Sequence, residues 1–221
     1  MVTEEEIKLQ EARIKMREIL PEPNLKKMPD SMKHWVPIFR KVWADDQRYR
    51  MLTNTEYLSL HWPEQKRLDS INLAIVDSFF NRYGRWPYQK WAGFFAHRAT
   101  GMIIQHAPLT KQEHYYPLIK KAYQDGEIGG ETLAMLQDRI NVRNKRFQLY
   151  GSQLCEYPKN EYVLYPVADV DSLDARRKRM GMISMDKNME LFFKLKWDLE
   201  AYKKSLPELV KALQVNGAPV E

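Results

Sequence analysis

Apolar side chains recur at helical spacing along most of the chain, and this period is the main guide to its structure. The clearest run comprises Trp35, Ile38, Phe39, Val42 and Trp43. It predicts a helix with one core-facing side. A second apolar run, from Lys66 to Tyr83, stops at Gly84, a residue suited to the left-handed turn that ends a helix. Further helices are expected over 90–105, 110–121 and 131–142.

The two ends of the chain have helical patterns of their own. Thr3 and Glu6 form a capping-box pattern that opens a strongly charged helix to about Ile19, which the Pro-containing stretch 20–23 stops. Asp171 or Ser172 is expected to cap a short helix that stops at Gly181. Asp186 is expected to cap the last predicted helix, which contains the apolar residues Leu191, Phe192, Leu195, Leu199 and Tyr202.

The period changes from helical to alternating only after residue 146. Stretches 147–157 and 162–167 are aromatic and β-branched, and Pro158 to Glu161 separates them, so a hairpin is expected near residues 146–167. Alternation would direct Gln148, Tyr150 and Ser152 to one face of the first strand. The predicted fold class is therefore mainly α (α+β), a multi-helix domain with one small β-hairpin.

Three segments follow from these elements. Residues 1–22 form an N-terminal surface helix with its Pro link, 30–183 a helical core domain with the hairpin, and 184–221 a C-terminal helical extension packed on the core. The chain has no internal repeat, low-complexity tract or Gly/Ser linker that would require a different division.

Composition narrows the class of protein. With 221 residues, 44% of them hydrophobic, the chain is long enough to bury a core, which excludes a disordered tail or a collagen-like repeat. Cys155 is the sole cysteine, so a disulfide scaffold and a zinc ribbon are also excluded. The net charge of +6 is mild and its basic residues are mostly interleaved with acids, so nucleic acid is not indicated as a partner.

Two stretches of the sequence bear on membrane contact and on location. The most apolar stretch, 91–104, is interrupted by His97 and Arg98 and is too short to cross a bilayer, so no membrane span is expected. The acidic start of the chain lacks the pattern of a secretory signal. The expected location is cytoplasmic, although a removed signal peptide would leave no trace.

The common motifs of nucleotide, dinucleotide, zinc-protease and serine-hydrolase sites are all missing from the sequence. Five histidines are present, His34, His61, His97, His106 and His114. Apart from the adjacent Glu113 and His114, they show no metal-ligand spacing with a nearby carboxylate, so we expect neither a metal nor a cofactor unless ligands far apart in the sequence come together.

One stretch of the chain combines polar and apolar residues in a way that suits a reaction. His106 follows the end of an apolar helix, where an imidazole would serve as a general acid or base. Asp138 lies near the core boundary of the 131–142 helix and would orient His106, while Arg139 would bind an anion. The structural alternatives are a histidine bound to a backbone carbonyl and an ordinary ion pair.

Other polar residues are candidates for substrate binding. Gln148, Tyr150 and Gln153 carry groups that recognise amides, hydroxyls or carboxylates, unless the hairpin is only an edge that faces water. Asp46 and Arg50 have i,i+4 spacing, which is also that of an ordinary helix salt bridge. The remaining candidates are Gln105, beside His106, and Arg177, in a basic cluster typical of a solvated helix face.

The order of these motifs resembles a bacterial family of unknown function. The pattern is DQ..R at 46–50, yG.P near 83–87, QHA at 105–107, DR at 138–139 and QxYGTQ at 148–153, with Ser152 where the family tends to have threonine. The similarity spans about residues 40–183. The resemblance implies one shared site, formed by Asp46, Arg50, Gln105, His106, Asp138, Arg139, Gln148, Tyr150 and Gln153. It implies no reaction.

Three hypotheses remain open from the sequence. The first is a metal-independent hydrolase or transferase that acts on a small polar or anionic substrate, with His106 as general acid/base and Asp138 as its partner. The second is a non-catalytic module that binds a peptide or another small ligand. The third is a helical interaction protein, in which the same polar residues form a buried structural network.

Overall fold

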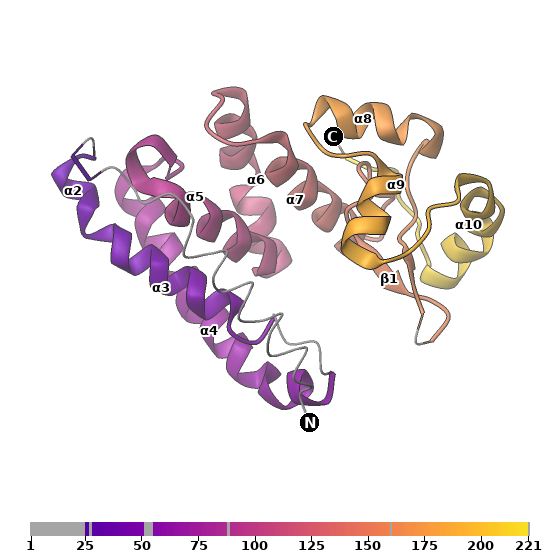
Figure 1. The fold of residues 1–221 in the computed structure, drawn as a ribbon, viewed down its shortest axis with the longest axis horizontal. Helices are drawn as coiled ribbons and strands as arrows, with labels where there is room; N and C mark the ends of the chain where they lie inside the picture. Colours follow the sequence, from indigo (N-terminus) through magenta and orange to yellow (C-terminus); the bar gives the residue numbers. More distant parts are fainter. Residues whose placement is uncertain (1–24, 27, 51–54, 88, 160, 221) are drawn as a thin grey trace. The chain divides into compact units, whose positions relative to one another are not determined.

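A computed structural model describes residues 25–26, 28–50, 55–87, 89–159 and 161–220 (Figure 1). The chain divides into two compact units, residues 1–107 and 108–221. The boundary falls inside residues 30–183, which the sequence predicts to form one core domain. The predicted N-terminal surface helix lies outside the described residues.

All regular elements in the described part of the first unit are helices. Its elements are α2 (Asp30–Lys33), α3 (Trp35–Gln47), α4 (Thr55–Tyr83) and α5 (Gln89–His106). Helix α4 begins well before the predicted Lys66 and contains Pro63, and it ends as expected at Gly84, whose φ is +61°. Helix α5 is kinked at Gly93, which has a φ of 84° that favours glycine.

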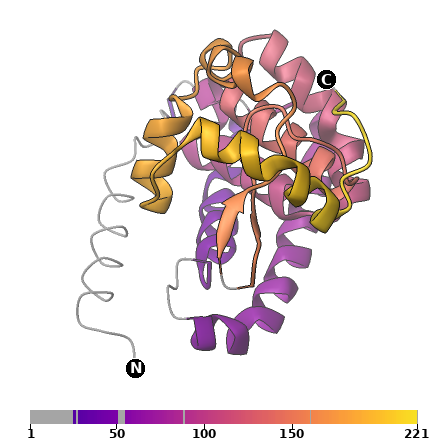
Figure 2. The ribbon, with the colours of Figure 1, turned by 90° about the vertical axis from the view of Figure 1, so that its right-hand side faces the viewer.

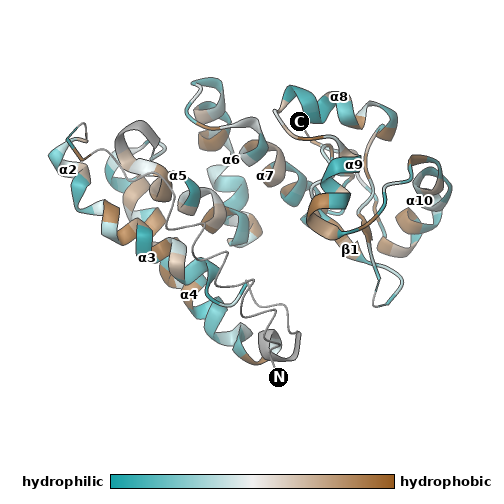
Figure 3. Cartoon of the chain, viewed as in Figure 1, coloured by the Kyte–Doolittle hydropathy of each residue, from teal (hydrophilic) through white to brown (hydrophobic). Residues whose placement is uncertain are grey.

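Helices α3, α4 and α5 pack against one another (Figure 1). Figure 3 shows apolar positions alternating with polar ones along α3 and α4, as amphipathic helices require. The rings of Trp35 and Phe39 both make edge-to-face contacts with Phe79, and Val42 and Val76 are fully buried beside them. The core-facing side predicted for 35–43 is therefore confirmed.

The second unit combines helices with the small sheet. Its elements are α6 (Leu109–Gln124), α7 (Gly130–Arg143), β1 (Leu154–Glu156), β2 (Tyr162–Leu164), the 3₁₀ turn η1 (Val170–Ser172), α8 (Leu173–Arg179), α9 (Met185–Asn188), the π-helix η2 (Met189–Phe193) and α10 (Leu199–Leu213). Strands β1 and β2 pair antiparallel, with Leu154 opposite Leu164. The prediction of a mainly α protein with one small hairpin is confirmed.

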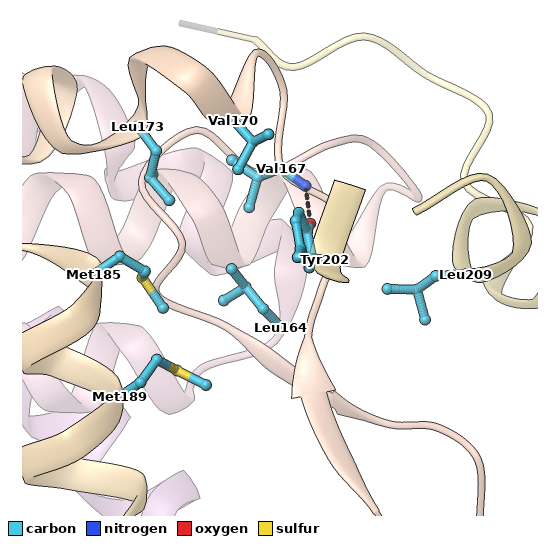
Figure 4. Close-up of a cluster of buried hydrophobic side chains, with 8 residues drawn as sticks. All are labelled: Leu164, Val167, Val170, Leu173, Met185, Met189, Tyr202 and Leu209. Carbon is cyan, nitrogen blue, oxygen red and sulfur yellow. Dashed lines mark hydrogen bonds between the residues drawn. The ribbon is translucent and has the colours of Figure 1, made fainter. Parts of the chain in front are cut away.

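The core of this unit lies between the hairpin, the α8–α9 region and α10 (Figure 4). Its buried side chains are Leu164, Val167, Val170, Leu173, Met185, Met189, Tyr202 and Leu209. The Tyr202 hydroxyl accepts the Val167 N–H at 2.9 Å and lies 3.2 Å from the Tyr165 carbonyl oxygen, to which it donates. Figure 2 shows α10 beside the hairpin that it covers.

The hairpin is shorter than predicted because the first half of its first strand is a loop. Gly151 has a φ of +64°, which interrupts an extended strand, and the backbone N–H groups of 149, 150 and 152 bind a side chain instead of a neighbouring strand. Stretch 147–153 keeps only an isolated bridge, between Gln148 and Val167. The expected alternation of Gln148, Tyr150 and Ser152 on one strand face is therefore wrong.

The predicted final helix from Asp186 is wrong as well. The chain forms α9 and η2, breaks at Lys194, where φ is 58°, and starts again as α10. Asp198 caps α10 by accepting the Ala201 N–H at 2.9 Å. This cap lies in the middle of the segment that the apolar pattern joins into one helix.

Among the described helices, none combines the length and the apolar character that crossing a membrane requires.

Candidate functional site

The imidazole of His106 is held by a buried carboxylate of its own unit. His106 is the last residue of α5, and its Nδ1 lies 2.7 Å from Oδ1 of Asp46, near the end of α3. Asp46 is fully buried, whereas 14% of the His106 side chain is exposed. In place of the Asp138 partner expected from the sequence, the structure gives His106 the carboxylate of Asp46.

A charged network surrounds this pair. Arg50 Nη1 donates to Asp46 Oδ1 at 2.9 Å and to the Asp46 carbonyl oxygen at 2.7 Å, so the expected i,i+4 pair is present, but largely buried. Arg50 Nη2 donates to Asp69 Oδ2 of α4 at 2.5 Å. Arg50 thus balances two carboxylates, and its role in binding an anionic substrate stays a prediction.

An amide side chain of α4 makes hydrogen bonds within the same network. Gln65 is fully buried, and its Nε2 lies 3.0 Å from Asp69 Oδ1 and 3.2 Å from the Asp45 carbonyl oxygen. Its Oε1 accepts the Tyr49 N–H at 3.1 Å. The amide therefore ties the end of α3 to α4 and limits the movement of Asp69.

Sequence reasoning missed Gln65 and Asp69. Their i,i+4 spacing would place them on one side of a helix, but nothing in that spacing says that Arg50 lies opposite. Gln105, which precedes His106, is 3% exposed and belongs to the interior of this unit.

In the second unit, a second buried carboxylate organises the loop that replaces the predicted strand. Asp138 Oδ1 accepts the N–H groups of Leu149 at 2.7 Å and Tyr150 at 3.0 Å, and Oδ2 accepts that of Ser152 at 2.9 Å. The side chain is fully buried. Burial raises the pKa of Asp138, while the three N–H donors act in the opposite direction because they favour the ionised form.

Two further predicted site residues hold the same loop. The amide of Gln148 is fully buried, donates to the carbonyl oxygens of Gln153 and Tyr165 at 3.0 and 2.7 Å, and accepts the Gln153 N–H at 2.9 Å. Arg177 is 1% exposed and donates to the carbonyl oxygens of Tyr150 and Ile183 at 2.6 and 2.7 Å. These contacts use the polar groups for local structure rather than presenting them to a ligand.

Arg177 is buried, unlike the exposed Lys178 and Arg179 of the same basic cluster. Burial lowers the pKa of Arg177, because the charged guanidinium loses water around it. The expectation of a solvated helix face is met by Lys178 and Arg179, which are exposed, but not by Arg177.

A cavity of about 750 Å³ opens beside the loop. Its lining comprises Arg139, Ser152, Gln153, Leu154, Glu161, Tyr162, Phe193 and Leu195. Arg139 and Gln153, two predicted binding residues, therefore share one cavity. Tyr150, which is also predicted to bind substrate, is half-buried and is not among these lining residues.

The predicted site residues thus fall into two groups, one in each unit. Asp46, Arg50 and His106 meet in the first, and the residues around Asp138 meet in the second. In the described part of the chain, no three His, Cys, Asp or Glu side chains are grouped so that they would hold a metal ion.

Comparison with known proteins identifies the class to which this chain belongs. Residues 68–201 match the family of unknown function DUF6624, and since this match covers more than half of the sequence, the chain belongs to that family. No curated protein and no solved structure matches the chain.

Proposed function

We propose that this protein is an enzyme that uses His106 as a general acid/base, in a hydrolysis or group transfer on a small polar substrate. The observation that supports this proposal is the 2.7 Å hydrogen bond between His106 Nδ1 and the buried carboxylate of Asp46. An ionised carboxylate only accepts hydrogen bonds, so Nδ1 carries the proton of this contact. In the neutral imidazole, Nε2 then has the free lone pair that a general base needs.

The surroundings of the pair suit that role. When Nε2 takes a proton from a nucleophile, the imidazolium that forms lies against the negative charge of Asp46. The same imidazolium would then return the proton to a leaving group. Arg50, itself held by Asp69, donates to the same Asp46 oxygen as His106, and Gln47 donates to the other oxygen at 2.6 Å, which fixes the carboxylate that orients the imidazole.

Fewer residues are candidates for substrate contact in this proposal than the sequence indicates. Asp46 is a positioning residue because it is fully buried and acts through His106. Arg50 belongs with it, since two carboxylates already engage its guanidinium. These residues therefore give no special support to an anionic substrate over a neutral polar one.

The test compares His106→Asn with the unaltered protein. Asparagine places its amide Nδ2 close to the position of the imidazole Nδ1, so it keeps a donor for Asp46 but has no base. The probes are p-nitrophenyl esters and phosphates and a small-metabolite extract, with products followed by absorbance and mass spectrometry. We expect a loss of turnover of about 10²–10⁴-fold.

Two further variants are compared with His106→Asn, one as a control and one as a test of the carboxylate. His114→Asn changes an exposed histidine and should leave turnover unchanged. Asp46→Asn should lower turnover and shift its pH profile, because the imidazolium loses its anionic partner. Turnover by His106→Asn equal to that of the unaltered protein, or no turnover of any probe by the unaltered protein, would refute the proposal. A loss of more than about 2 kcal/mol of stability in His106→Ala, with no turnover, would favour a structural network.

A further inference from the structure

The second unit has a cavity of its own, and the chemistry of its lining points to a ligand. Its walls come from α7, the loop 152–153, the first residues of both strands, the end of η2 and the residues that follow η2. A volume of about 750 Å³ is within the usual range of small-ligand sites, about 300–1,000 Å³. All of the lining residues belong to the second unit, so the cavity is complete within it.

Charged groups of both signs line this cavity. Arg139 comes from α7, and Glu161 comes from the end of the hairpin that precedes β2. A guanidinium binds a carboxylate through two parallel N–H donors, and a carboxylate attracts an ammonium group. The pair therefore complements a ligand that carries both charges, rather than a simple anion or cation.

The remaining lining residues suit amides and apolar groups. Ser152 and Gln153 bring a hydroxyl and an amide, the groups that recognise a peptide bond. Tyr162, Phe193 and Leu195 are 63%, 39% and 40% exposed, unusually high values for large apolar side chains in one place. Exposed apolar residues that gather around a concave surface are typical of a binding site.

A second hollow of about 450 Å³ extends the apolar part. Tyr162 and Leu195 line both hollows, so the two are neighbours. The walls of the second hollow are mostly apolar and include Trp197, Met189 and Leu209. It offers space for a bulky apolar side chain, beside the polar groups of the first cavity.

We propose that these two hollows together bind a short peptide with free ends and bulky apolar side chains. Arg139 holds the terminal carboxylate, Glu161 faces the terminal ammonium, and Gln153 recognises the peptide bond. Phe193 and its apolar neighbours receive the side chains. This inference does not rest on the proposed function of His106, since it concerns binding and needs no turnover.

The test is a titration of the full-length, isotope-labelled protein with the dipeptide Leu-Phe, followed by NMR of backbone amides. We expect saturable shifts at Ser152, Gln153 and Tyr162. The amidated dipeptide, which lacks the carboxylate, and the Arg139→Gln variant should each bind at least about tenfold more weakly. N-acetyl-Leu-Phe, which lacks the free amine, should bind similarly weakly. Glu161→Gln should remove the preference of the protein for the free amine over the acetylated one.

Two pairs of variants provide matched controls. Phe193→Ala should weaken binding about tenfold or more, whereas Phe192→Ala, which changes a 69% exposed neighbour outside the lining, should alter it less than about twofold. Arg179→Gln changes an exposed arginine of α8 and should also have little effect. Unchanged amide spectra away from each substitution establish that the variants are folded.

Three results would overturn the proposal. The first is the absence of saturation up to about 10 mM dipeptide, which leaves no specific site. The second is equal binding of octanoate and Leu-Phe with no effect of Glu161→Gln, which indicates a site for simple apolar carboxylates. The third is a dimer in solution that Phe193→Ala dissociates, without any dipeptide binding, which assigns this face to a second copy of the chain.

Discussion

Replacement of Asp138 tests how the second unit holds its loop. Both oxygens of this carboxylate are used by backbone N–H groups, those of Leu149, Tyr150 and Ser152. Asp138→Ala leaves three donors without that acceptor. An unsatisfied buried donor costs about 1–3 kcal/mol, and water reaches part of this loop, so we expect a loss of about 3–5 kcal/mol in the free energy of unfolding.

Asp138→Asn is the sharper variant because it conserves shape. One amide oxygen can still accept two of the N–H groups, while the new NH₂ group meets the third donor. Loss of one buried hydrogen bond costs about 1–3 kcal/mol. Burial raises the pKa of Asp138, so the ionised form carries a desolvation cost that asparagine avoids. We therefore expect the lower half of this range.

Two measurements on the full chain check this order of effects. Urea unfolding gives the stability, and because the chain has two units, amide hydrogen exchange locates the change. Exchange at Leu149 and Ser152 should accelerate at least about tenfold in Asp138→Ala. Asp125→Asn, a change at an exposed carboxylate of the same unit, should alter stability by less than about 0.5 kcal/mol. Equal or greater stability of Asp138→Asn, with protected amides, would refute the reasoning.

Three further predictions concern other parts of the fold. Burial, with a smaller effect of Arg98, lowers the pKa of His97 to about 4, so between about pH 6.5 and pH 4 only the unfolded chain gains a proton. The free energy of unfolding should therefore drop by up to about 3 kcal/mol as the pH falls to about 4, and should be unaffected above about pH 6.5. His97→Asn should flatten this part of a series of urea unfolding curves measured at different pH values. Gly130→Ala would place a Cβ 2.6 Å from the Met180 carbonyl oxygen, so we expect a lower melting temperature by calorimetry, whereas Gly129→Ala, with open space around it, should not show one. Tyr202→Phe removes a buried acceptor and should cost about 1–3 kcal/mol in urea unfolding; an unchanged midpoint would contradict this.

Hydrophobic periodicity predicts most of the helices because one side of each faces a core. The runs at 35–43 and 131–142 are such cases, and α3 and α7 cover them. The same pattern fails around Lys194, where apolar residues continue on both sides of a chain reversal. A period records which residues are buried, but it does not record a break between two elements that bury residues in the same core.

The sequence identifies residues of the candidate site, such as His106, better than it identifies the contacts between them. His106 stands out at the end of an apolar helix, and the structure gives it a carboxylate. Its partner Asp46 lies 60 positions away, a separation that no local spacing identifies. The loop after residue 147 was equally hidden, since its sequence alternates like a strand while its N–H groups bind Asp138. Such contacts depend on how helices and loops pack, not on neighbouring residues.

The two buried carboxylates show why burial alone does not identify a reactive group. Asp138 accepts backbone N–H groups and the Ser152 side chain, none of which exchanges protons readily, so its carboxylate serves to shape a loop. Asp46 meets an imidazole, whose second ring nitrogen can accept or donate a proton, and an arginine that fixes its position. The chemistry of the partner therefore separates the two sites, and it is the reason why we propose His106, positioned by Asp46, for the acid/base role.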